Sequence, residues 1–308
     1  MTPQVSVCLV PEAPYPSFVS RARRLEQAGC ARVWVYCNVL WRQRPDADIA
    51  GPLSALSAIL GATRTLHAGL LVASPNLYHP VVLAKEILSL DALSGGRAEI
   101  VLGSGATGSG DPATDAGIRT GTLPSRAQRT EVFADFVQAF GHAVALSRDP
   151  SRGGWTGRHY GVQLHRLTPP AREGFGFGVA ANGSRGIRLA AGGSGRWVTS
   201  LPVDEEGSGD LDRLGALGKE FDAACAERDP APGDAAAAPV TRTVFVPLNE
   251  AGYQRSLPLW REFLATAGGA GFDEVVLHSP RPHDPGLAGP SAEVFAAAFP
   301  GLEGGGDE

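Results

Sequence analysis

Short apolar runs alternate along this chain with segments in which apolar residues recur every three or four positions. The run RVWVY at residues 32–36 is rich in β-branched and aromatic residues, which is typical of strands buried on both faces. The intervening segments have the spacing of helices that bury one face. The pattern predicts strands at residues 5–10, 32–36, 66–72, 98–102, 177–181, 197–201, 241–247 and 274–278. It predicts helices at residues 16–29, 52–60, 80–93, 126–146, 184–191, 210–227, 250–267 (kinked at Pro258) and 291–299.

Each predicted strand is followed by a helix, so the strands should run parallel and the fold class is α/β. Eight such units in 308 residues predict a closed (β/α)8 TIM barrel. An open doubly wound sheet is the alternative, and it is disfavoured because no G-x-G-x-x-G follows the first strand. We expect one domain over residues 1–300, a hairpin at 155–162, a linker at 229–239 and a flexible tail at 301–308.

Composition narrows the classes of partner. A net charge of −5 and a pI near 5.8 argue against broad binding of nucleic acid or an anionic membrane. The sequence contains no run of about 18 apolar residues, the length that a membrane-spanning helix needs. Residues 1–10 lack the features of a signal peptide. The scattered cysteines have no C-x-x-C spacing, so we expect reduced thiols in a cytoplasmic protein. They are Cys8, Cys30, Cys37 and Cys225.

The active site of such a barrel lies at the carboxyl ends of its strands. The ends of the fourth and fifth strands are rich in small residues, which let backbone approach a flat ligand. Ser184 is a plausible N-cap, the helix it opens offers N–H groups to a phosphate, and Arg185 adds a charged donor. Either loop alone is more simply a tight turn. When the two loops are considered together, a phosphorylated cofactor bound over the barrel mouth is as well supported as two tight turns.

The inventory of catalytic motifs is short. The sequence has no H-E-x-x-H, G-x-S-x-G or Walker loop. His278, His79 and Glu12 lie far apart in sequence, so no metal site is predicted. The absence of an obvious acid–base pair suggests that a bound cofactor carries the chemistry.

Several motifs resemble those of a known family. The run YHPVVLAKEILSLDALSGGR at 78–97, the following strand that ends in LGSGA, and RVWVY at 32–36 are similar to the bacterial luciferase-like monooxygenase superfamily. Weaker similarity continues through RTEVFADF, WTGRHYGV and VAANGSRG, so about two-thirds of the chain is covered. Members are (β/α)8 barrels that use FMN or the deazaflavin coenzyme F420. This chain is compact for the family, with few insertions.

The resemblance implies a cofactor site. In the family, a bulge with a non-proline cis peptide at the end of the third strand backs the cofactor ring, here near Leu70 and Leu71. The end of the fourth strand contacts ring or ribityl atoms, and the loop after the fifth strand binds the ribityl-phosphate region. The corresponding residues are Ser104, Gly105 and Ala106, and Ala181, Asn182, Gly183, Ser184 and Arg185.

The resemblance leaves the proton donor open. F420-dependent relatives often end the second strand in Asp-His, where this chain has Cys37 and Asn38. Asn38 can form hydrogen bonds but does not exchange a proton at neutral pH. The candidate donors are therefore Cys37, Tyr36 and Glu12, although Cys37 also suits a plain buried thiol.

Two further positions are candidate substrate contacts. Trp41 suits stacking on substrate or core packing equally, and His79 suits closing the loop over the helix start or contacting substrate. The SGGR motif at residues 94–97 precedes a strand, so it should stabilise the far end of the barrel.

The leading functional hypothesis is an F420H2-dependent reductase. It would transfer hydride to an activated C=C, C=N or C=O group of a biosynthetic intermediate, for example a dehydroamino residue of a peptide or other natural product. The alternatives are an FMN-dependent monooxygenase and, from another class, a non-catalytic barrel subunit or binding protein. The expected partner is a small-molecule or peptide substrate, and the resemblance also allows a homodimer.

Overall fold

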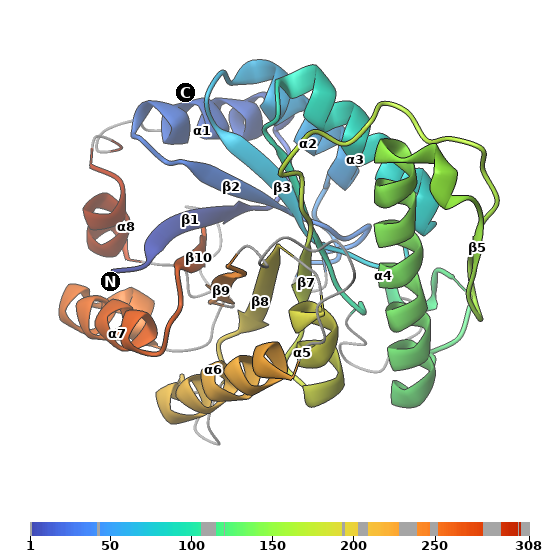
Figure 1. Ribbon diagram of the computed structural model, residues 1–308. Helices are drawn as coiled ribbons and strands as arrows, with labels where there is room; N and C mark the ends of the chain where they lie inside the picture. The colour runs from blue at the N-terminus through green and yellow to red at the C-terminus, as the bar shows by residue number, and fades with distance from the viewer. Residues whose placement is uncertain are drawn as a thin grey trace. The chain divides into compact units, whose positions relative to one another are not determined.

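A computed structural model describes residues 2–41, 44–105, 115–119, 121–192, 195–202, 209–227, 239–246, 252–279, 291–300 and 302. Within these ranges, eight parallel strands close into a barrel in the order β1–β10–β9–β8–β7–β4–β3–β2, which confirms the predicted (β/α)8 fold (Figure 1). The barrel strands are β1 (Gln4–Leu9), β2 (Arg32–Tyr36), β3 (His67–Ala73), β4 (Ala98–Leu102), β7 (Gly178–Ala180), β8 (Arg196–Ser200), β9 (Thr241–Phe245) and β10 (Glu274–His278).

The helices also follow the predicted order. They are α1 (Tyr15–Gln27), α2 (Pro52–Ala62), α3 (Pro80–Ser94), α4 (Arg126–Arg148), α5 (Ser184–Ala191), α6 (Leu211–Ala226), α7 (Leu257–Gly269) and α8 (Ala292–Ala298). No helix in the described ranges is both long and apolar enough to cross a membrane. Apart from Pro239 and Leu302, the predicted linker and tail lie outside the described residues. A single domain over residues 1–300 stays a prediction.

The expected kink at Pro258 was wrong. The α7 helix begins at Leu257, which places Pro258 in its first turn, and a separate 3-10 helix at Gly252–Arg255 precedes it. Proline is well accommodated in a first turn because the N–H that it lacks would have no partner within the helix.

One compact unit comprises residues 1–10, 20–34 and 178–308. In it, β1 pairs with β10, β10 with β9, β9 with β8 and β8 with β7, all in parallel. Helices α5 and α6 lie side by side, and α5 packs on β7 and β8 (Figure 1). The Trp197 ring stacks on Phe221 of α6 with centroids 4.4 Å apart, so a buried aromatic pair joins sheet to helix.

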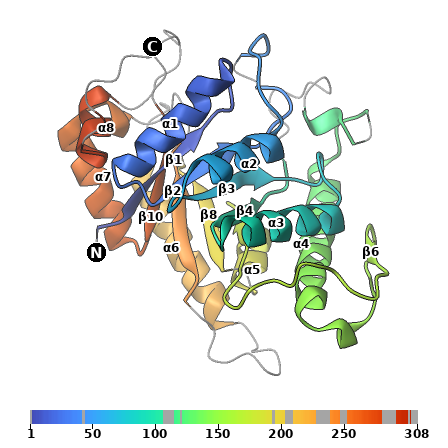
Figure 2. The same cartoon turned by 90° about the horizontal axis from the view of Figure 1, so that it is seen from above.

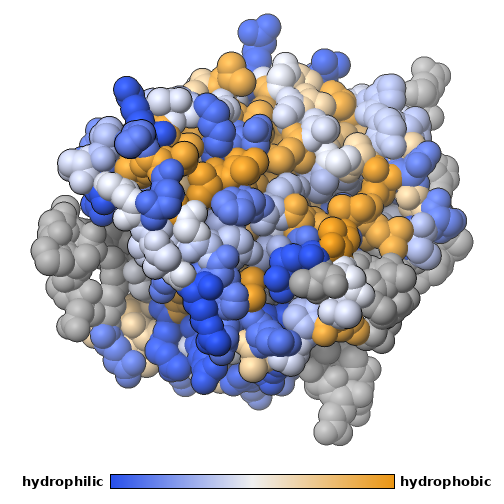
Figure 3. Space-filling model, turned by 90° about the vertical axis from the view of Figure 1, so that its right-hand side faces the viewer, coloured by the Kyte–Doolittle hydropathy of each residue, from blue (hydrophilic) through white to orange (hydrophobic). Residues whose placement is uncertain are grey.

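A second compact unit comprises residues 11–19 and 35–177. Its strands β3 and β4 pair in parallel, and its long helix α4 packs beside α3 (Figures 1 and 2). Strands β5 (Trp155–Thr156) and β6 (Gly161–Val162) form the predicted antiparallel hairpin against α4. On the side where α4 and β5 lie, apolar surface is broken up by polar side chains (Figure 3).

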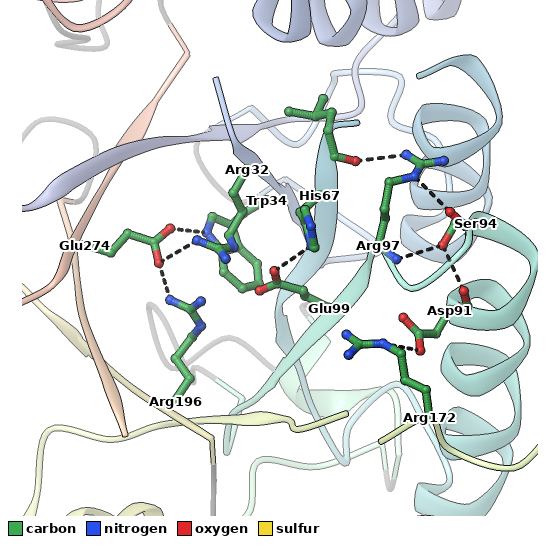
Figure 4. Close-up of polar contacts among 11 residues, drawn as sticks. Arg32, Trp34, His67, Asp91, Ser94, Arg97, Glu99, Arg172, Arg196 and Glu274 are labelled. Atoms are coloured by element: carbon green, nitrogen blue, oxygen red, sulfur yellow. Dashed lines mark hydrogen bonds and ion pairs between the residues drawn. The ribbon is translucent and has the colours of Figure 1, made fainter. Parts of the chain in front are cut away.

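The SGGR motif has structural contacts. The Arg97 guanidinium donates to the carbonyl oxygen of Ser94 at 2.9 Å (Figure 4). It also donates to the carbonyl oxygens of Leu60 (2.8 Å) and Leu66 (2.9 Å) and to Thr63 Oγ1 (3.1 Å). Arg97 precedes β4, so these bonds tie α2 and α3 to the amino end of that strand. The contacts agree with the stabilising role expected of the motif.

Candidate functional site

The carboxyl end of β3 has an irregular backbone. The peptide bond between Leu71 and Val72 is cis, and the register with β4 shifts between Leu71 and Ala73. This confirms the bulge and the non-proline cis bond that were expected near Leu70 and Leu71.

The glycines at the end of β4 fit against that irregular backbone. A Cβ at Gly103 would collide with Val72 Cγ2 and lie 2.9 Å from Val72 Cβ. Gly105 has φ +76°, and a Cβ there would collide with the Asn76 amide and lie 3.3 Å from Ser74 Oγ. The sequence suggested room for a ligand, whereas the structure adds a packing reason for both glycines. Ser104 between them is half-buried, and Ala106 lies outside the described residues.

The end of β7 leads into an uncapped helix. Gly183, and not the predicted Ser184, occupies the N-cap position of α5, and no side chain caps this end. Gly183 has the extended backbone of an N-cap (φ −118°, ψ 154°), whereas Ser184 is already helical. The N–H groups at the start of α5 therefore have no partner within the helix. Both Ser184 and Arg185 are exposed beside them.

Asn182 is held by its neighbours in the sheet. Its Oδ1 accepts hydrogen bonds from Thr199 Oγ1 at 2.9 Å and from the Ser200 N–H at 3.1 Å. The carbonyl of Ala181 accepts from Trp197 Nε1 at 2.9 Å. With Oδ1 engaged, the side-chain NH2 of Asn182 is oriented and remains a donor. This loop is therefore a preorganised group of donors: backbone N–H groups, an amide and a guanidinium.

A cluster of ionisable side chains gathers where β2 and β3 end. A hydrogen bond of 3.7 Å joins Cys37 Sγ to the Tyr78 hydroxyl, and Asp115 lies close enough to act on both electrostatically. Burial, as the largest cause, raises the pKa of Cys37 to about 12, against a lowering by the bond to Tyr78. Burial likewise raises the pKa of Tyr78 above its usual range, with further contributions from Cys37 and Asp115. Both groups therefore stay protonated at neutral pH.

Asp115 is fixed in this cluster by backbone donors. Its Oδ1 accepts from the N–H groups of Val39 at 3.1 Å and Leu40 at 3.3 Å. The sequence pointed to Cys37 but missed Tyr78 and Asp115 as members of the site. The position of Tyr78 beside the His-Pro pair was the only signal for it, and Asp115 follows a glycine-rich loop without periodicity.

A sequence profile described as luciferase-like monooxygenase matches residues 2–297. The chain belongs to the luciferase-like monooxygenase family. Its fold is shared by an F420-dependent secondary alcohol dehydrogenase, solved with an F420–acetone adduct, at a TM-score of 0.74 and 14% identity over 99% of this chain and 100% of that one. A coenzyme F420-dependent tetrahydromethanopterin reductase from Methanopyrus kandleri has a TM-score of 0.67 and 13% identity over 98% of each chain.

A third structure has a different activity on the same fold. EDTA monooxygenase from Chelativorans sp. BNC1 has a TM-score of 0.59 at 17% identity, over 80% of this chain and 64% of its own. Membership of the family makes this chain a luciferase-like oxidoreductase. Identities this low show the fold and leave cofactor and substrate open.

The other candidate catalytic residues of this luciferase-like enzyme, Glu12, Tyr36 and Asn38, differ in their contacts. Glu12 Oε1 lies 3.3 Å from Arg44 Nη1 in an ion pair. Tyr36 is the half-buried last residue of β2, and Asn38 is also half-buried. Within the described ranges, no three His, Cys, Asp or Glu side chains gather as metal ligands.

The two predicted substrate contacts differ in exposure. Trp41 is 1% exposed, so it packs in the core, which was one of its two predicted roles. His79 is exposed at the N-cap position of α3, and its ring meets Tyr160 edge-on with centroids 5.6 Å apart. Its place at the helix start suits the loop-closing role.

We expect Gly103→Ala to lower the free energy of unfolding by about 1–3 kcal/mol, because the new methyl group would overpack the β3–β4 contact. Val72→Ala on that background should recover part of the loss, since it removes the Val72 methyl groups but leaves the Val72 Cβ close by. Urea denaturation of both single variants and the double variant measures this coupling. Simple additivity would contradict the proposed contact.

Proposed function

We propose that this luciferase-like oxidoreductase is an F420H2-dependent reductase that transfers hydride to an activated C=C, C=N or C=O group. The observation that carries the proposal is the uncapped start of α5, with exposed Ser184 and Arg185 and an oriented Asn182. Backbone N–H groups at a helix start and a guanidinium form a donor set suited to a phosphate. This donor set fits the phosphate end of F420, and equally that of FMN.

The residues would divide the binding between them. The start of α5 would hold the phosphate. Contacts of the ring with Leu70, Leu71, Ser104 and Gly105 at the ends of β3 and β4 stay a prediction from the family resemblance. When bound, the reduced coenzyme supplies the hydride, while the protein orients it and excludes water. The donors Cys37 and Tyr78 hold protons near the ends of β2 and β3.

Coverage supports F420 over FMN. The two F420-dependent structures match this chain over nearly its whole length and theirs, whereas EDTA monooxygenase matches over 64% of its own chain. An FMN-dependent monooxygenase is therefore the second candidate. A peptide or natural-product substrate and a homodimer stay predictions.

Fluorescence quenching with F420 and with FMN tests the cofactor directly. Saturable quenching at micromolar F420, with no response to FMN, would support the reductase. Binding of FMN alone would favour the monooxygenase, and binding of neither would refute both.

Arg185→Ala should weaken F420 binding about 10- to 100-fold, because it removes a charged donor to phosphate. Arg188→Ala is the matched control: Arg188 is also exposed on α5, but lies one turn further from the helix start. We expect it to leave the Kd unchanged within about twofold, since helix-terminus effects fall off within a turn. Equal losses in the two variants would indicate a general charge effect and would count against a phosphate site at the start of α5.

A further inference from the structure

We propose that Asn76 and Ser74 form a subsite for the ring of the cofactor, in which the Asn76 amide pairs with the –CO–NH– edge that the rings of F420 and FMN share. The proposal rests on the proposed function and adds the part of the ring that this chain recognises. Neither residue was among those predicted from the sequence to bind a ligand. Both lie just after β3, at the end of the strands where ligands bind in this fold.

The two side chains are almost completely buried, yet they are not used by the protein. Ser74 is 5% exposed and Asn76 is 6% exposed. Neither side chain forms a hydrogen bond within the part of the chain that the structure describes. Neither has a polar atom that is sealed from solvent, so the polar atoms lie on the small part of each residue that stays accessible. Because buried polar groups in folded proteins are nearly always hydrogen-bonded, this pair points to a bound ligand.

The surrounding backbone fixes where the two side chains lie. The Ser74 carbonyl accepts hydrogen bonds from the N–H groups of Leu77 at 3.1 Å and Tyr78 at 3.2 Å, which closes a turn around Asn76. A Cβ on Gly105 would collide with Asn76 Nδ2 and would lie 3.3 Å from Ser74 Oγ. Both side chains therefore border the same glycine of the loop after β4, and the missing side chain at Gly105 leaves the room that the amide occupies.

The chemistry of an amide side chain selects the ligand group. Asn76 offers an N–H donor and a C=O acceptor side by side, and this holds for either orientation of the amide. A ligand that satisfies both at once must present an acceptor and a donor on one edge. The pyrimidinedione ring of F420 and FMN does so, because ring closure holds its C=O and N3–H groups cis. An open-chain secondary amide is trans and has the two groups on opposite sides.

This subsite differs in kind from the donor set at the start of α5. The α5 loop offers donors, which suit a phosphate. A phosphate beside Asn76 would leave the amide oxygen without a donor, whereas a ring N–H supplies one. The Ser74 hydroxyl, which borders the same glycine, supplies one further donor for a ring carbonyl.

Asn76→Leu separates binding from folding, because it nearly keeps the shape of the side chain and removes its polar atoms. It should weaken F420 binding about 10- to 100-fold, as measured by fluorescence quenching. Urea denaturation of the cofactor-free protein should show no loss of stability, since no hydrogen bond within the protein is removed.

Gln254→Met is the matched control. The Gln254 amide is also buried, at 1% exposed, but its Oε1 is sealed from solvent, where no ligand reaches it. The Kd for F420 should stay within about twofold of the wild-type value. Equal losses of affinity in Gln254→Met and Asn76→Leu would mean that any buried amide matters, and would overturn the subsite.

A modified cofactor tests the paired edge itself. The N3-methyl derivative of F420 lacks the ring N–H, so it should bind the wild type and Gln254→Met about 10- to 100-fold more weakly than F420 does. In Asn76→Ala, which also makes room for the methyl group, the two compounds should bind with Kd values within about threefold of each other. This variant also provides a second test should Asn76→Leu not fold.

The outcomes separate this proposal from the reductase. Binding of FMN and not of F420 would remove the reductase, while a loss of affinity on N3-methylation of FMN that Asn76→Ala abolishes would still support the subsite. An unchanged Kd for F420 in both Asn76 variants would overturn the subsite and leave the reductase standing. The same loss on N3-methylation in Asn76→Ala as in the wild type would do so too. Binding of neither cofactor would overturn both proposals.

Discussion

Replacing Glu274 by Gln should lower the free energy of unfolding by about 3–5 kcal/mol, the usual cost of breaking a buried ion pair from one side. The side chain of Glu274 is 2% exposed at the first residue of β10, and it is surrounded by donors. Arg196 forms an ion pair with it, Arg32 Nη1 lies 3.3 Å from its Oε2, and Trp34 Nε1 donates to Oε1 at 3.3 Å (Figure 4). Gln would leave two guanidinium groups without the one carboxylate they share.

The cluster is closed by further contacts. Thr243 Oγ1 accepts from Arg196 Nη1 at 2.7 Å and donates to Glu274 Oε2 at 3.3 Å. The Arg196 guanidinium lies over the Trp34 ring, 5.3 Å from its centroid. Both oxygens of the carboxylate therefore have partners among the described residues: Oε1 has Trp34, and Oε2 has Arg32, Arg196 and Thr243.

Asp222→Asn is the control for this prediction. Asp222 Oδ1 lies 2.5 Å from Arg242 Nη2, but its side chain is 60% exposed, so its loss should cost at most about 1 kcal/mol. Urea denaturation measures both variants. A second test introduces Arg196→Met into the wild type and into the Glu274→Gln variant. Arg196→Met should lower the free energy of unfolding less in the Glu274→Gln variant, because Arg196 has already lost its carboxylate partner there. A cost below about 1 kcal/mol for Glu274→Gln would show that the cluster adds no stability.

The fold was predictable because its signals are local. A five-residue run such as Arg32–Tyr36 reports burial by itself, and the alternation of strands and helices fixes the fold class. Contacts between side chains that are far apart in the sequence were not predictable in this way. Glu274 and its partner Arg32 open their strands as ordinary charged ends, and only the closed barrel brings them together across 242 positions of sequence.

In the candidate site too, features within one sequence segment were predictable and contacts between distant residues were not. The family motif located the cis bond after Leu71 and the glycines of β4, since these lie within one continuous segment. The packing role of Gly103 depends on Val72 of the neighbouring strand, which a single run of sequence does not reveal. Cys37 was proposed from its alignment with a family position, whereas its partner Tyr78 required the tertiary structure.

Asp135→Asn should lower the free energy of unfolding by about 2–3 kcal/mol, because one buried carboxylate organises the whole β5–β6 turn. Its Oδ1 accepts from the N–H of Arg158 at 3.2 Å, and its Oδ2 from those of His159 at 2.5 Å and Tyr160 at 2.8 Å. An amide NH2 in place of either oxygen would face N–H donors. The cost should therefore approach that of Asp135→Ala.

The loss should be concentrated in the hairpin. The turn closes around Asp135 so tightly that a Cβ at Gly157 would collide with both Asp135 and Trp155. Hydrogen exchange should accelerate at the amides of residues 158–160 more than in β3 or β4, because those amides lose their acceptor. Trp155 and Tyr160, which pack against the buried cluster of Ala139, Leu146 and Val162, should become more exposed with them.

Glu131→Gln is the matched control, one turn earlier on α4. Glu131 Oε2 lies 2.9 Å from Arg158 Nη1 of the same hairpin, but the two side chains are 47% and 75% exposed. We expect a loss of no more than about 1 kcal/mol and no change in exchange at residues 158–160. Because both variants remove one negative charge beside the same turn, a difference between them isolates the buried backbone bonds. Equal effects would mean that long-range charge, and not those bonds, holds the hairpin on α4.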